Sequence, residues 1–128
     1  MGIQRLDHVN VRTAQLDVMI RWYDDVLGIK TGHRADFPFP GAWIYAGETA
    51  AVHLIEVAGD AGAGSEAKLK LEHFAFSATD LTGFLAHLDA RGERYERSEL
   101  PSEGLTQINV WDPDGNHIHV DFKSNETS

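Results

Sequence analysis

The sequence contains no cysteine. Disulfide scaffolds, thiol catalysis and zinc sites with cysteine ligands are therefore excluded. The sequence also lacks any run of about eighteen apolar residues, the length that a membrane-spanning helix requires. The first residues, 1–5, do not form the apolar core of a signal peptide. We therefore expect a soluble, cytoplasmic protein with no membrane partner.

Basic residues are scarce. The chain has 11 Lys and Arg but 20 Asp and Glu, which gives a formal net charge of −9. A field of that sign repels phosphate backbones, so we expect no nucleic-acid partner. The arginines that could bind an anionic substrate are scattered, namely Arg12, Arg21, Arg34 and Arg91. With 128 residues, 42% of them hydrophobic, the chain is long enough for one globular domain, residues 1–128.

The stretch 111–122 combines a turn with a strand. Pro113 and Gly115 supply the backbone angles of the turn. The residues after it alternate in polarity with the period of a half-buried strand. One face of that strand carries His117, His119 and Asp121, and the other carries Ile118, Val120 and Phe122. Two imidazoles and a carboxylate on one face indicate a site.

The same kind of pattern predicts the remaining elements. Strands are expected at 5–11, 29–34, 42–46, 50–57, 69–77, 94–99, 105–111 and 117–122. One helix is expected over 15–27 with Thr13 as its N-cap, and a second from 79–80 to Gly92. Two prolines make 37–41 a stiff loop that bears aromatic residues. Residues 58–68 form a linker rich in glycine and alanine, and 123–128 a polar tail.

The two halves of the chain repeat one another. Residues 6–9, Leu-Asp-His-Val, match residues 71–74, Leu-Glu-His-Phe, and residues 52–54 match 118–120. Each half has the order strand, helix and three strands. The sequence therefore predicts an α+β fold of two βαβββ units, about 3–57 and 69–122.

The repeat singles out four histidines at equivalent places: His8 and His53 in the first unit, His73 and His119 in the second. We expect each to lie within the first or last strand of its unit, facing a shared cleft. Four imidazoles would suit zinc, nickel, cobalt, copper or ferrous iron better than magnesium or calcium. A single strand histidine is more often structural, and a duplicated fold has no structural need for four. His33 and His87 lack repeat partners and are expected at the surface, and His117 at the rim of the site.

The paired motifs, together with Trp-Tyr at 22–23, Leu-Gly at 27–28 and Asp-Pro-Asp-Gly-Asn at 112–116, resemble the vicinal-oxygen-chelate superfamily. That superfamily includes glyoxalase I, extradiol dioxygenases and bleomycin-resistance proteins. The resemblance covers residues 3–122 and implies a half-open, cleft-bearing mixed β-sheet barrel with a helix outside each unit. It implies one divalent metal held by His8, His53, His73 and His119, and a homodimer.

The chain departs from the superfamily pattern at one metal position. Most metal-binding members carry Glu after this turn, where the chain has His119. The change removes the carboxylate that carries protons in glyoxalase-like members. Asp121, on the same face as His119, is the better substitute base, because Glu56 lies on the face opposite His53.

Three functions remain open. The first is a metal-dependent lyase or isomerase that chelates a small oxygenated substrate and moves a proton on an adjacent carbon. The second is an extradiol-type dioxygenase using ferrous iron, which would need Asp121 or Glu56 as its carboxylate ligand. The third is a metal-free small-molecule binding or resistance protein whose cleft is lined by Phe37, Phe39, Trp43 and Tyr45.

Overall fold

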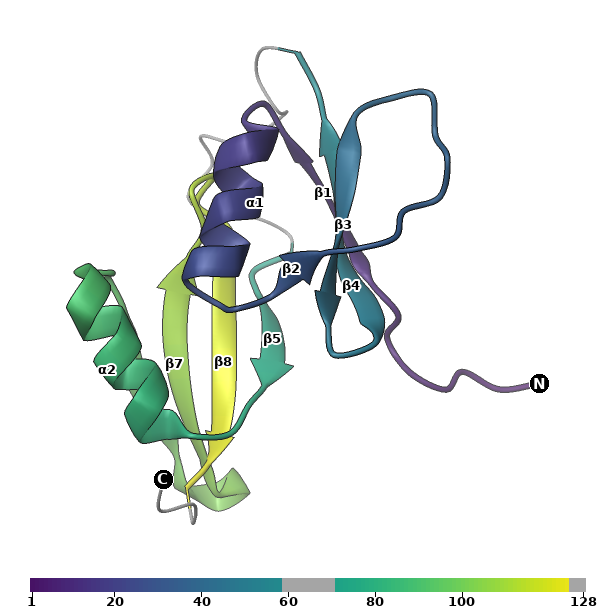
Figure 1. The fold of residues 1–128 in the computed structure, drawn as a ribbon. Coiled ribbons are helices and arrows are strands. Elements are labelled where there is room, and N and C mark those ends of the chain that lie inside the picture. The colour runs from purple at the N-terminus through teal and green to yellow at the C-terminus, as the bar shows by residue number, and fades with distance from the viewer. Residues whose placement is uncertain (59–70, 125–128) are drawn as a thin grey trace. The chain divides into compact units, whose positions relative to one another are not determined.

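A computed structural model describes residues 1–58 and 71–124. The chain divides into two compact units, residues 1–65 and 66–128. Figure 1 shows the helices and strands of both units, coloured along the chain. Most of the expected linker, 58–68, and of the expected tail, 123–128, lies outside the described residues.

The first unit is a four-stranded mixed sheet with one helix. Its elements are β1 (Val9–Thr13), α1 (Leu16–Asp25), β2 (Lys30–Thr31), β3 (Gly41–Ala46) and β4 (Thr49–Glu56). The strand order is β1-β4-β3-β2, with β1 parallel to β4 and the other neighbours antiparallel. The outer strands of the unit therefore come from the start and the middle of its sequence.

The second unit repeats this architecture. Its elements are β5 (Phe74–Ser77), α2 (Leu81–Arg91), β6 (Glu96–Leu100), the short 3-10 helix η1 (Pro101–Glu103), β7 (Leu105–Trp111) and β8 (His117–Lys123). The strand order is β5-β8-β7-β6, with β5 parallel to β8. The predicted α+β fold of two βαβββ units is confirmed.

Strand alternation separates the core from the site in each unit. In β4, Val52 and Leu54 are buried, and His53 between them projects from the other face. In β8, Ile118, Val120 and Phe122 are buried, and the histidines lie on the opposite face. The buried face of α1 carries Met19 and Tyr23, and Figure 1 shows α1 and α2 each beside the strands of its own unit. The helices thus cover one face of each sheet and leave the histidine face uncovered within the unit.

The second helix begins and ends where the sequence indicates. Asp80 is its N-cap, and its carboxylate accepts the backbone N–H of Gly83 at 3.0 Å. Gly92 ends it with a φ of +68°, a conformation that glycine adopts without strain. Among the described residues, no helix is long and apolar enough to cross a membrane.

The predictions for the starts of α1, β1 and β5 are wrong. Thr13 is not the N-cap of α1, because it is the last residue of β1 and its hydroxyl accepts the N–H of Gln15 at 3.1 Å, ahead of the helix. The predicted strands at 5–11 and 69–77 begin later, since pairing with the parallel neighbour starts at Val9 in β1 and at Phe74 in β5. His8 and His73 therefore immediately precede their strands instead of lying within them.

Candidate functional site

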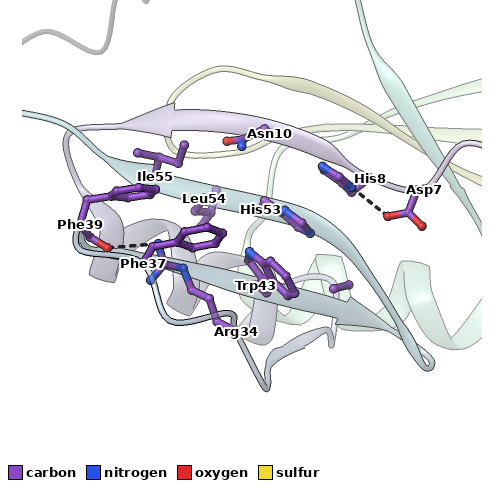
Figure 2. Close-up of a pocket in the computed structure, with 11 residues that line it drawn as sticks. Asp7, His8, Asn10, Arg34, Phe37, Phe39, Trp43, His53, Leu54 and Ile55 are labelled. Atoms are coloured by element: carbon purple, nitrogen blue, oxygen red, sulfur yellow. Dashed lines mark hydrogen bonds and ion pairs between the residues drawn. The ribbon is translucent and has the colours of Figure 1, made fainter.

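In the first unit, His8 and His53 form a stacked pair. Their ring centroids are 3.8 Å apart and their planes differ by 5°. The parallel pairing of β1 with β4 sets Asn10 opposite His53, so the residue two positions before Asn10 reaches the same face. Trp43, the cross-strand partner of His53 in β3, stacks on that ring at 4.2 Å. Figure 2 shows the three rings in a row on one face of the sheet.

A carboxylate fixes the first ring of this pair. Nδ1 of His8 donates to Oδ1 of Asp7 at 2.9 Å. This hydrogen bond, opposed by partial desolvation and aided by the charge of the imidazole, lowers the pKa of Asp7. With Nδ1 engaged, Nε2 is the ring nitrogen of His8 that could bind a metal.

The second unit contains an equivalent pair. The rings of His73 and His119 are stacked at 3.9 Å with planes 14° apart. The parallel pairing of β5 with β8 sets Ala75 opposite His119, which repeats the relation of Asn10 to His53. The structure therefore brings together the two predicted histidines of each unit.

Glu72 has the place in the second unit that Asp7 has in the first, but it contacts two rings. Its Oε1 accepts Nδ1 of His73 at 2.5 Å, and its Oε2 accepts Nδ1 of His117 at 3.0 Å. These two hydrogen bonds, with that from His73 the stronger influence, lower the pKa of Glu72. One carboxylate therefore links both imidazoles.

His117, expected only at the rim, is part of this cluster. Its side chain is 18% exposed, and its Nε2 lies 2.8 Å from Oδ1 of Asn109. The amide of Asn109 is itself oriented, because its Nδ2 donates to the carbonyl of Glu96 at 3.1 Å. Trp111 stacks on the His117 ring at 5.1 Å. The sequence signal for His117 was its shared face with His119.

Asp121 lies two residues after His119 in β8, and its charge acts on the His119 ring. Its Oδ1 is buried and has no hydrogen-bond partner among the described residues. Asp121 follows His119 on the same face and lines a cavity of about 320 Å³ together with Ser77 and Lys123. Glu56 is exposed at the end of β4, on the face opposite His53, as the sequence indicates. The exposed positions of His33 and His87 also agree with the prediction.

A cavity of about 520 Å³ adjoins the histidine pair of the first unit. Phe37, Phe39 and Trp43 line it, as expected for a binding cleft. Tyr45 is not among its lining residues and donates its hydroxyl hydrogen to the carbonyl of His33 at 2.7 Å. Arg34, one of the scattered arginines of the sequence, also lines the cavity.

Comparison with known proteins agrees with this geometry. Residues 5–120 match the model of the Glyoxalase/Bleomycin resistance protein/Dioxygenase superfamily. The chain belongs to this superfamily. A glyoxalase family protein from Bacillus anthracis has a similar fold, with a TM-score of 0.77 at 20% identity over 96% of this chain and 98% of that one. Lactoylglutathione lyase from Agrobacterium tumefaciens gives a TM-score of 0.71 at 18% identity, covering 97% of each chain.

A sequence relative is the lactoylglutathione lyase GLX1 of Arabidopsis thaliana. It is 27% identical over 118 residues, which are 88% of this chain. The chain spans 42% of the length of that relative. The comparisons therefore establish the superfamily and the fold.

The histidines of this superfamily member fit a divalent metal. One ligand atom from each of His73, His117 and His119 lies within 4.8 Å of the others. Nδ1 of His119 is buried without a hydrogen-bond partner among the described residues, and a buried polar atom of this kind is costly unless a ligand or water satisfies it. Burial, and then the charges of neighbouring histidines, lower the pKa of His119; burial and the charge of His8 do the same for His53. Both rings therefore favour the neutral form that binds metals.

Proposed function

We propose that the chain is a metal-dependent lyase or isomerase of the glyoxalase type. It would bind a small substrate with two neighbouring oxygens and move a proton on the adjacent carbon. The ligands of the divalent metal would be His8 and His53 from one unit and His73 and His119 from the other. Nickel, zinc, cobalt and ferrous iron all suit such nitrogen ligands.

The observation that carries this proposal is the repetition of one arrangement in both units. In each, two stacked imidazoles stand on the uncovered face, and a carboxylate holds Nδ1 of the first. A histidine that ligates a metal through one ring nitrogen commonly donates the other N–H to a carboxylate. A core or surface role would not require the same set of contacts twice.

Asp7 and Glu72 act in this proposal as positioning residues. Each restricts the rotation of the following histidine and selects the tautomer that presents Nε2. His117 supports Glu72 from the other side, and Asn109 supports His117. His117 belongs to the cluster of three imidazoles, but both of its ring nitrogens are engaged, so it would bind the metal only after releasing Glu72 or Asn109, and the proposal assigns it to positioning.

Asp121 would carry the proton. A bound metal would supply a Lewis acid that stabilises negative charge on the chelated oxygens. Asp121 would take the proton from the carbon that bears one of the chelated oxygens and return it to the carbon that bears the other. Asp121 would thus be ionised again at the end of the reaction. Its unpaired, buried Oδ1 is the atom available for that transfer.

Proton movement can be followed directly in heavy water. Purified protein loaded with each candidate metal would be mixed with hydroxyacetone or with lactoylglutathione, and deuterium at the exchanging carbon measured by NMR. We expect exchange that requires the metal, stops on addition of chelator and returns when metal is restored. The His33→Gln variant, altered at an exposed histidine, should exchange like wild type. Metal-loaded protein that leaves both compounds unexchanged would contradict the proposed reaction.

The extradiol alternative predicts a different result in the same sample. It requires ferrous iron with a carboxylate ligand, and the three residues grouped closely enough for a metal in the second unit are all histidines. Oxygen consumption on addition of catechols would favour this alternative. A metal-free binding protein would show neither exchange nor oxygen uptake.

The resemblance to the superfamily also leads us to propose a homodimer. Light scattering coupled to size exclusion measures the mass in solution. A mass near twice 14.2 kDa is expected, and a mass near 14.2 kDa would contradict the dimer.

A further inference from the structure

The cavity of the first unit combines two kinds of surface. His8 and His53 line one part of it, and the aromatic rings of the loop 37–41 and of Trp43 line another. Figure 2 shows the loop aromatics and Arg34 beyond Trp43 on the side away from His8. A molecule held at the histidines would therefore extend toward the aromatic rings.

Arg34 has no carboxylate partner among the described residues, and the one carboxylate that lines the cavity, that of Asp7, is hydrogen-bonded to His8. No carboxylate of the described residues lies within ion-pair distance of Arg34, although the chain has 20 acidic and only 11 basic residues. Its Nε is buried and has no hydrogen-bond partner among the described residues. An unpaired buried donor on a cation is costly unless something else satisfies it.

The remaining contacts of Arg34 hold the guanidinium in place. Nη2 donates to the carbonyl of Phe39 at 3.1 Å, and Cζ lies 5.0 Å and 5.3 Å from the ring centroids of Phe37 and Phe39. Gly41 makes room for it, because a Cβ at Gly41 would lie 2.8 Å from Nη2 and 2.3 Å from the carbonyl oxygen of Leu54. The arginine is thus ordered before any ligand arrives.

The aromatic part of the cavity offers ring faces to a ligand. Phe37 and Phe39 are stacked with centroids 5.2 Å apart, yet they remain 43% and 39% exposed. Large exposed aromatic residues beside a cavity favour the binding of an apolar, planar group. Trp43 continues this surface as far as His53.

We propose that this cavity binds a carboxylate-bearing molecule with an aromatic ring, and that Arg34 is the residue that selects the carboxylate. The ring would lie against Phe37, Phe39 and Trp43. The inference rests on the proposed function only for the part of the substrate that is chelated at the histidines. For the rest of the substrate it names a chemical class, a carboxylate with an aromatic ring. A purely structural Arg34 would hold the loop through Nη2 and the two rings and would leave its buried Nε without a hydrogen-bond partner.

The test is a matched set of three compounds. 3-Phenyllactate carries the ring and the carboxylate, 3-phenyl-1,2-propanediol carries the ring without charge, and lactate carries the charge without the ring. Binding would be measured by isothermal titration calorimetry on the full chain, both as purified and after metal removal. We expect 3-phenyllactate to bind at least about 10-fold more tightly than either of the other two, since hydrogen bonds to charged groups are the stronger class.

Variants separate recognition from folding. Arg34→Gln should weaken 3-phenyllactate about 10-fold or more and leave the diol unchanged, and Arg34→Lys should recover part of the loss. Trp43→Leu should weaken both ring compounds several-fold. Arg21→Gln, altered at an exposed arginine of α1, is the control and should bind like wild type.

Two results would overturn the inference. One is 3-phenyllactate binding no better than the diol in wild type, and the other is equal binding of 3-phenyllactate by Arg34→Gln and wild type. The comparison of the three compounds is repeated without metal. A protein that binds 3-phenyllactate through Arg34 but takes up no metal would therefore contradict the proposed reaction and leave the present inference intact.

Discussion

The two units share a fold and differ in how firmly they hold their histidines. In the first unit, Asp7 contacts one imidazole, and the pair adjoins an open cavity with aromatic walls. In the second, Glu72 bridges two imidazoles, and Asn109 anchors the second of them. The two units therefore share a stacked histidine pair with a carboxylate on its first ring, while the surroundings of the pairs differ. In the proposed function, the first unit would add substrate contacts to its two metal ligands, and the second would hold its two ligands more firmly.

The most severe test of this comparison removes one ligand from each unit. His8→Ala and His73→Ala should each lower the affinity for zinc by more than about 100-fold, since second-sphere changes alone commonly cost about 10–100-fold. Competition with a coloured chelator measures both affinities. If His8→Ala bound zinc as tightly as wild type, the second unit would be sufficient and the shared-ligand model would be wrong.

Replacement of Asp121 separates chemistry from metal binding. Asp121→Asn should slow proton exchange by about 100-fold or more while the metal content stays unchanged, because general base catalysis contributes about 10²–10⁴-fold. Deuterium exchange and elemental analysis of the same sample check both parts. Unchanged exchange would remove Asp121 from the mechanism.

The two carboxylates can be compared directly. Glu72→Gln should lower zinc affinity by about 10–100-fold, and Asp7→Asn by less, because Glu72 holds two rings and Asp7 one. Asp17→Asn, at an exposed residue of α1, is the control. Equal losses in the two variants would mean that the bridge to His117 contributes nothing to metal binding.

The smallest expected effect is on the stability of metal-free protein. Burial lowers the pKa of His53 and of His119 in the folded chain, so the unfolded chain takes up more protons as the pH falls. The stability from these neutral rings is present above about pH 6.5, the ordinary value for histidine, and is lost progressively below it. With chelator present, the melting temperature should fall by a few degrees between neutral pH and about pH 5.5.

The double variant His53→Gln/His119→Gln shows whether these rings are responsible. Its melting temperature should change less over the same range of pH. A slope equal to that of wild type would assign the pH dependence to other groups.

The sequence was sufficient to predict the repeated order of helices and strands. It was not sufficient to predict where a strand begins when pairing with a distant strand decides that position. Strand alternation located β7 and β8 because their buried and exposed residues differ in polarity. The start of β1 depends instead on its pairing with β4, which residues 5–8 do not encode. This is why His8 was expected inside a strand and lies just before one.

The residues of the candidate site also divide into those that the repeat identifies and those whose roles depend on tertiary contacts. Repeat symmetry identified both histidine pairs, because duplication preserves them at a fixed spacing. His117 and Arg34 have no counterpart in the other unit, so the repeat gave no signal for them. The role of His117 depends on contacts with Glu72, 45 residues earlier, and with Asn109 on the neighbouring strand.

The metal content of the wild-type protein tests the central claim most directly. Elemental analysis after exposure to zinc, nickel, cobalt and ferrous iron, followed by removal of loosely bound ions, gives the ratio of metal to chain. The account predicts about one ion per chain of at least one of these metals. A ratio near zero with all four would contradict it.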